Sequence, residues 1–116
     1  MTVVKLEKTH WHSFCDRASH GLMGKRAEIE VNSPIFGVQI EAKWLPVIGL
    51  VYDPASGVLD ILLDGLDHMI SHPRELYVQY GTGGVDSLGI LDGDNCWQIV
   101  LLRDPVMLPA PRPAVS

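Results

Sequence analysis

The spacing of apolar residues changes along the chain from a helical to a strand-like period. Near the N-terminus apolar side chains recur every three or four positions, at Trp11, Phe14, Cys15, Ala18 and Leu22. This spacing gathers them on one face of a helix. We therefore predict a helix from about His10 to His20.

From residue 27 onward apolar and polar residues alternate, which is typical of strands with one buried face. The predicted strands are Ala27–Val31, Val38–Trp44, Val47–Tyr52, Val58–Leu63, Arg74–Tyr80, Ser87–Leu91 and Cys96–Leu102. Pro46 cannot continue a ladder, so Trp44–Pro46 is expected to form a bulge or corner. The segment Gly65–Ser71 fits either a helical turn or a loop. On the last strand we expect Trp97 and Ile99 to face the core.

One helix followed by six or seven short strands joined by hairpins predicts an α+β protein. We expect an N-terminal helix followed by a strongly curved antiparallel sheet or a small partial β-barrel. A chain of 116 residues is long enough for one core. We assign residues 1–108 to a single α+β domain and residues 109–116 to a proline-rich C-terminal tail.

Composition and charge narrow the range of partners. Fourteen acidic and nine basic residues give a net charge of −5, which disfavours nucleic acid as a partner. The N-terminus lacks the apolar run of a signal peptide, and no apolar stretch approaches the ~20 residues of a membrane span. Cys15 and Cys96 are interpreted as buried, reduced thiols. We therefore expect a cytoplasmic protein with no membrane partner.

One group of side chains has the composition of a metal site. Asp64, His68 and His72 lie four residues apart. On a helix they would share a face and suit Zn²⁺ or Fe²⁺. Gly65 and Pro73 interrupt such a helix. We therefore predict no metal site, no cofactor and no catalytic residue, and we keep the two histidines and the aspartate as the candidates to examine.

Several blocks of sequence together resemble a known family. They are Gly24-Lys-Arg-Ala-Glu-Ile-Glu30, Trp44-Leu-Pro-Val-Ile-Gly49 with Tyr52-Asp-Pro54, Gly65-Leu-Asp-His-Met-Ile70 with His72-Pro-Arg-Glu75, and Arg103-Asp-Pro-Val-Met-Leu-Pro109. In these blocks the chain resembles small bacterial proteins classed as domain of unknown function 5335. The resemblance spans nearly the whole chain and implies no activity.

A second resemblance is to the small barrels of Sm-like RNA-binding proteins. Leu59–Asp64 and Leu91–Asn95 are similar to their first and second motifs. Where those motifs have a base-reading Asn and an Arg, this chain has Asp60 and Asp92, and carboxylates repel phosphate. This likeness therefore implies a barrel fold and not RNA binding.

The sequence as a whole favours a small non-catalytic cytoplasmic module that binds a protein partner or assembles with itself. Two alternatives stay open. One is a metal-dependent enzyme that uses Asp64, His68 and His72. The other is an Sm-like RNA-binding protein, which the acidic charge disfavours.

Overall fold

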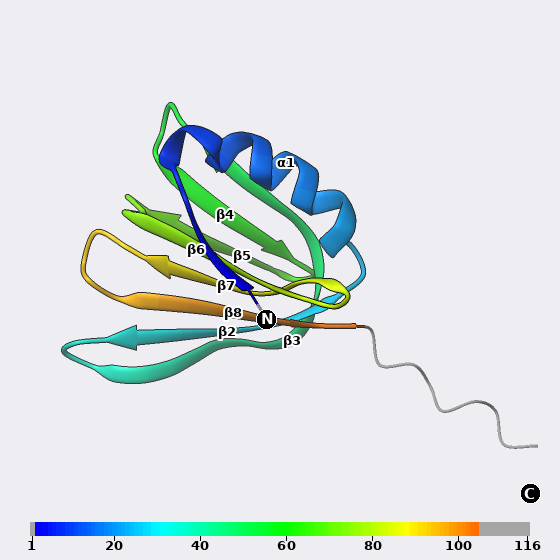
Figure 1. The fold of residues 1–116 in the computed structure, drawn as a ribbon. Helices are drawn as coiled ribbons and strands as arrows, with labels where there is room; N and C mark the ends of the chain where they lie inside the picture. The colour runs from blue at the N-terminus through cyan, green and yellow to red at the C-terminus, as the bar shows by residue number, and fades with distance from the viewer. Residues whose placement is uncertain (1, 105–116) are drawn as a thin grey trace, which may run out of the picture.

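A computed structural model describes residues 2–104, so the predicted tail lies outside the described residues. In chain order the elements are β1 (Thr2–Leu6), the 3₁₀ turn η1 (Lys8–His10), α1 (Trp11–Leu22), β2 (Arg26–Ser33), β3 (Gly37–Asp53), β4 (Val58–Leu63), β5 (Leu66–Ser71), β6 (Glu75–Gly81), β7 (Gly84–Leu91) and β8 (Trp97–Arg103). The strands form one antiparallel sheet in the order β1-β6-β7-β8-β2-β3-β4-β5 (Figure 1).

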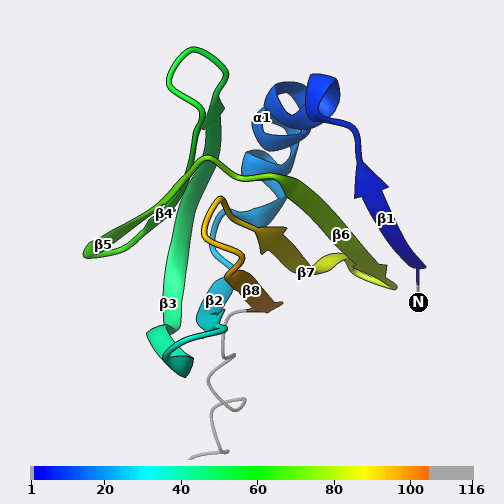
Figure 2. The same cartoon turned by 90° about the vertical axis from the view of Figure 1, so that its left-hand side faces the viewer.

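The sheet is open, with β1 and β5 at its two ends. It bends around α1: Figure 2 shows β3, β4 and β5 on one side of the helix and β1 and β6 on the other. The predicted class, one N-terminal helix with an antiparallel sheet, is confirmed, but the sheet is not closed into a barrel. Within residues 2–104, no helix is both long and apolar enough to cross a bilayer.

The predicted count of six or seven strands is wrong, because the sheet has eight. The prediction missed β1, whose residues do not alternate in polarity. It also treated Gly65–Ser71 as a helical turn or loop, whereas Leu66–Ser71 is strand β5. A two-residue turn reverses the chain there, and its Gly65 has a φ of +83°, which suits glycine. Conversely, two predicted strands are parts of the single 17-residue strand β3.

The helix packs its apolar face against the sheet as predicted. Its buried side chains are Trp11, Phe14, Cys15 and Leu22. The Trp11 ring meets the edge of Tyr52 on β3, with centroids 5.2 Å apart and planes at 78°. Its Nε1 donates a hydrogen bond to the Leu6 carbonyl at 3.0 Å. Burial of this side chain and satisfaction of its one polar group therefore fix β1 and α1 relative to β3.

Strand β3 changes its neighbour midway. Its first half, residues 37–46, pairs with β2, and its second half, residues 47–53, pairs with β4. The change lies at the predicted corner, where Trp44 has a φ of +54°. The Arg26 guanidinium donates to the Trp44 carbonyl at 3.1 Å, and the Arg103 guanidinium lies 3.8 Å from the centre of its ring. Two arginines thus hold the corner in place.

The last strand faces the opposite way from the prediction. Gln98 and Val100 are 7% and 1% exposed, whereas Trp97 is 39% exposed, so Trp97 and Ile99 lie on the face away from the core. Both alternating sets of β8 are largely apolar, and the sequence pattern alone cannot choose between them. The set that contains Gln98 faces the core because the Gln98 amide bonds there to the buried Asp92 and the half-buried His68.

Candidate functional site

The three candidate metal ligands are spread along a hairpin. Asp64 lies exposed in the β4–β5 turn, His68 is half-buried in β5, and His72 follows β5 with a φ of +52°. Four residues of strand span about 13 Å, so neighbouring members of the series are too far apart to bind one ion. No group of three or more His, Cys, Asp or Glu suited to a metal ion occurs within residues 2–104.

His68 instead joins a polar chain that we call the clasp: His68, Gln98 and Asp92. The His68 Nε2 lies 2.5 Å from the Gln98 Oε1, and the Gln98 Nε2 donates to the Asp92 Oδ2 at 2.9 Å. Since the amide nitrogen of Gln98 is used by Asp92, its oxygen is the acceptor for His68. Nε2 of His68 therefore carries a proton.

The clasp connects two distant parts of the sheet. His68 lies on the end strand β5, and Gln98 lies on β8 in the middle of the sheet. Asp92 is 8% exposed and also accepts from the backbone N–H groups of Asp94 (2.8 Å) and Cys96 (3.0 Å). Each of its carboxylate oxygens is thus occupied, and the clasp serves to hold β5 against β8.

Asp60 does not meet Asp92, although an Sm-like motif would bring the two positions together. Asp60 pairs with Met69 and Val51, on the opposite face of β4 from the buried Leu59 and Ile61. Asp92 belongs to the clasp on the core side. The structure therefore lacks the closed barrel that the Sm-like resemblance implies.

Asp60 is nevertheless electrostatically unusual. Burial raises the pKa of its carboxyl, and the nearby Asp67 carboxylate raises it further, while His68 acts in the opposite direction. Among the described side chains, the Asp60 Oδ1 is the one buried oxygen or nitrogen that has no hydrogen-bond partner. A carboxyl in this state holds its proton more tightly than a solvated one.

The two cysteines differ in their surroundings. Cys15 is fully buried, and burial, reinforced by the Asp16 carboxylate, raises the pKa of its thiol to about 12. Such a thiol is not a nucleophile at neutral pH. The prediction of two buried thiols is wrong for Cys96, which is only partly buried; neither forms a disulfide.

The face of the sheet that points away from α1, which we call the outer face, is unexpectedly apolar. Residues matched in register share a face, and one row crosses six strands: Lys5, Tyr77, Gly89, Ile99, Glu30 and Ile40. A second row runs through Leu91, Trp97, Asn32 and Val38. Trp97, Leu101, Val38 and Ile40 are 39%, 38%, 56% and 52% exposed.

Two aromatic rings lie at the centre of the outer face. Tyr77 and Trp97 have centroids 5.7 Å apart, and Gly89 between them leaves a shallow hollow of about 230 Å³. The Tyr77 hydroxyl donates to the Glu75 Oε1 at 2.6 Å, and the Lys5 Nζ lies 3.1 Å from the same oxygen. The hydrogen bond from Tyr77 and the Lys5 ammonium lower the pKa of Glu75.

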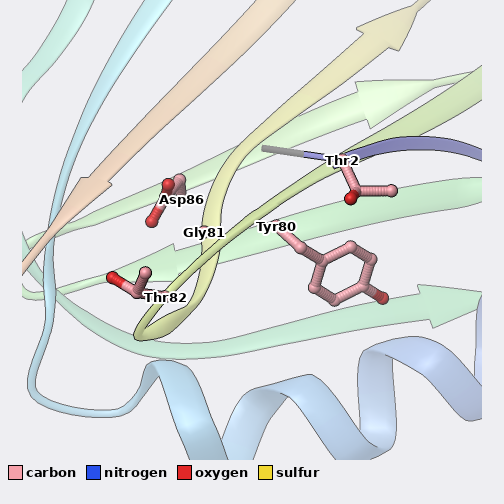
Figure 3. A pocket seen from close by; sticks show the side chains of 5 residues that line it. All are labelled: Thr2, Tyr80, Gly81, Thr82 and Asp86. Carbon is pink, nitrogen blue, oxygen red and sulfur yellow. The ribbon is translucent and has the colours of Figure 1, made fainter.

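Another hollow, of about 450 Å³, lies at the β6–β7 turn and is lined by Thr2, Tyr80, Gly81, Thr82 and Asp86. The Asp86 carboxylate packs against the Cα of Gly81, where a side chain would collide with it. Figure 3 shows the Tyr80 ring pointing away from Asp86 and Thr82. The polar groups that line the hollow do not point toward a common centre, so the hollow lacks the geometry of a binding site.

Neither the clasp nor the outer face is predicted by the sequence pattern. The one feature of the sequence that indicates an apolar outer face is that β8 carries apolar residues on both of its sides. The alternation predicts that Val38 and Ile40 lie on the buried side of their strand, whereas both are more than half exposed.

Comparison with known proteins identifies relatives without a described activity. The model of a family described as "Family of unknown function (DUF5335)" matches residues 2–111. An uncharacterized protein of Aquifex aeolicus (strain VF5) is 29% identical over 110 residues, covering 94% of this chain and 99% of the relative. No solved structure matches.

Proposed function

The chain belongs to the family of unknown function DUF5335, and we propose that it is a small, non-catalytic cytoplasmic module that binds another protein chain through the outer face of its sheet. The observation that supports this proposal is the exposure of Val38, Ile40, Trp97 and Leu101 on one side of an ordered sheet. They form two groups, on β8 and on β3, that are separated by the polar residues of β2. Exposed apolar side chains rimmed by polar residues on a folded domain are typical of a protein interaction surface.

The hydrogen bonds made by the polar side chains also favour a binding module over an enzyme. The imidazole of His68 and the carboxylate of Asp92 are occupied in the clasp. Glu75 is occupied by Tyr77 and Lys5 on the outer face. These groups stabilise local structure, and none of them is paired with an accessible nucleophile.

The charge on the outer face favours a protein partner over nucleic acid. Glu28 and Glu30 of β2 lie between the apolar residues of β8 and those of β3, because Leu101 and Ile99 pair with them in register. A phosphate backbone laid across this face would meet both carboxylates. A protein partner with apolar side chains and scattered basic residues would be attracted.

Site-specific photo-cross-linking tests the proposal. A photoreactive phenylalanine analogue replaces Leu101 on the outer face, and the matched control replaces Arg17 on the solvent side of α1. After irradiation of cells of the organism that encodes the chain, we expect protein adducts from position 101 and none from position 17. Equal yields from the two positions would reject the outer face as a binding surface.

A further inference from the structure

The first half of β3 leaves one edge of the sheet open. Strand β2 occupies one side of residues 37–46, whereas β4 pairs only with residues 47–53. In the part of the chain that the structure describes, no strand lies on the other side of residues 37–43, which Figure 1 shows at the lower border of the sheet. Alternate backbone N–H and C=O groups there point outward, and such a row is a template for another strand.

An ordered hairpin presents apolar side chains beside this edge. The Ser33 Oγ accepts hydrogen bonds from the backbone N–H groups of Ile35 and Phe36, both at 3.1 Å. Gly37 closes the turn with a φ of +74°, the left-handed conformation that a three-residue hairpin turn requires. Ile35 and Phe36 are nevertheless 82% and 76% exposed. The hairpin therefore displays its apolar residues in a fixed geometry.

The edge is also compatible in charge with a copy of itself. Although the chain carries −5 overall, the segment Gly37–Lys43 contains one acid, Glu41, and one base, Lys43. Residues 38–40 contain no charged side chain. Two copies of this segment can therefore approach without local repulsion.

We propose that a second copy of this chain pairs antiparallel with the first half of β3 around a twofold axis at Gln39. This inference goes beyond the proposed binding role, because the contact lies at the edge of β3 and does not cover Trp97 and Leu101 on β8. Val38 of each copy then lies opposite Ile40 of the other, which gives two apolar cross-strand pairs. Glu41 lies opposite Gly37, so no like charges face each other. The two sheets become one continuous sheet with a self-complementary contact.

The other two free edges are less suited to self-pairing. Strand β1 carries Lys5, which is held by Glu75, and lysine on an edge strand discourages pairing. Strand β5 carries the exposed Asp67 and also His68, which is bound in the clasp. Strand β1 also exposes Val3 and Val4, but it is only five residues long. The open ladder of β3 runs from Gly37 to Lys43, with the exposed Val38 and Ile40 in its uncharged part and the exposed apolar hairpin beside it.

Disulfide trapping tests both the contact and its register. Gln39→Cys is made in a Cys96→Ser background, because residues 39 and 96 line the same hollow and would otherwise pair within one chain. In the proposed dimer the two introduced thiols lie opposite each other, so oxidation of purified protein should give most of the chain as a covalent dimer. Glu41→Cys is the matched control, because its two copies would lie about 13 Å apart along the strand.

Sedimentation of the unmodified protein provides an independent measurement. A single pair of strands is a small contact, so we expect the mass to rise from 12.8 kDa towards twice that value between about 10 and 500 μM. Ile40→Lys should remain monomeric throughout with an unchanged circular dichroism spectrum, because Ile40 is half-exposed in the monomer.

The results separate this inference from the proposed function. A monomer at all concentrations, or equal trapping at positions 39 and 41, overturns the proposed dimer. Adducts from position 101 with a protein of different mass would then still support the binding module. A concentration-dependent dimer that Ile40→Lys abolishes, together with trapping at position 39 alone, supports the self-pairing.

Discussion

The two halves of β3 have the same strand conformation but opposite surroundings. Each half pairs with a single strand, residues 37–46 with β2 and residues 47–53 with β4. The remaining edge of the second half meets α1, where the Ser19 Oγ donates to the Leu50 carbonyl at 2.7 Å and accepts from the Leu50 N–H at 2.9 Å. In the first half, no described element bonds to the corresponding edge. One edge is thus completed within the chain, and the other is open to a partner.

The side chains of the two halves differ in the same way. Val47, Leu50 and Tyr52 are between 2% and 4% exposed, whereas Val38 and Ile40 are more than half exposed. Both halves contain apolar residues at the spacing of a strand. The difference lies in the face that carries them. Val47, Leu50 and Tyr52 belong to the core that α1 covers, whereas Val38 and Ile40 lie on the outer face, and Ile48 and Val51 of the second half are exposed as well. Apolar alternation therefore identifies a strand but does not decide whether its apolar side is core or interface.

The largest predicted effect compares one aliphatic residue from each half. Leu50→Ala removes a side chain that is 2% exposed, and we expect a loss of about 2–5 kcal/mol in the free energy of unfolding. Ile40→Ala, at the half-exposed position, should change it by no more than about 0.5 kcal/mol. Urea denaturation at a concentration where the protein is monomeric measures both. Similar losses would show that the two halves are equally buried in solution.

Disruption of the clasp is expected to cause the next largest loss of stability. The clasp joins β5, which lies beyond β4 from the second half of β3, to β8. Gln98→Leu keeps the volume but leaves the buried Asp92 carboxylate and the His68 imidazole without their shared partner. We expect a loss of about 2–3 kcal/mol. The same substitution at the exposed Gln39, again in the monomer, should be nearly neutral. A neutral Gln98→Leu variant would show that the clasp contributes no net stability.

Ser19→Ala tests directly the contact that distinguishes the two edges of β3. It removes the hydroxyl that satisfies the Leu50 N–H and carbonyl groups, and we expect a loss of about 1–2 kcal/mol. Ser13→Ala is the matched control, because the Ser13 hydroxyl is exposed and bonds only within its own helix turn, to the His10 carbonyl. If both variants unfold at the same urea concentration, α1 does not stabilise the edge of the second half.

Local patterns predicted much of the fold. The periodicity around Trp11 identified α1, and the alternation of Ala27 with Ile29 identified the buried side of β2. Pro46 correctly marked the corner of β3. These predictions succeed because periodicity and turn chemistry are determined by neighbouring residues.

The errors occur where a distant contact decides the outcome. The orientation of β8 depends on hydrogen-bond partners for the Gln98 amide on the core side, and one of those partners, His68, lies 30 residues away in the sequence. Val38 lies on the outer face, away from α1, and its alternation with Gln39 does not reveal which side of the strand meets the core. The segment Gly65–Ser71, predicted as a helical turn or loop, is largely strand β5, so the helix on which the metal alternative depended does not form. None of these contacts has a local signature in the sequence.

The smallest predicted effect concerns two carboxyls that adjoin the second half of β3. Asp60, opposite Val51, has a raised pKa because of burial, so the folded state binds its proton more tightly than the unfolded chain does. That contribution to stability is complete below the unfolded value of about 3.9 and is lost as the pH rises through the folded pKa. At pH 7, Asp60→Asn should therefore raise the melting temperature by about 1–3 °C, and the gain should vanish at about pH 3.5.

Asp53, the last residue of β3, provides the control of opposite sign. Hydrogen bonds from the Ala55 N–H at 3.0 Å and the Ser56 hydroxyl at 2.9 Å lower the pKa of its carboxyl. Its stabilisation is present above the unfolded value and is lost as the pH falls through the folded pKa. Asp53→Asn should therefore lower the melting temperature at pH 7 and have less effect in acid. Thermal melts of both variants from about pH 3 to 7 test whether the two melting temperatures shift in opposite directions. Shifts in the same direction at neutral pH would contradict the environment that the structure gives to one of the two carboxyls.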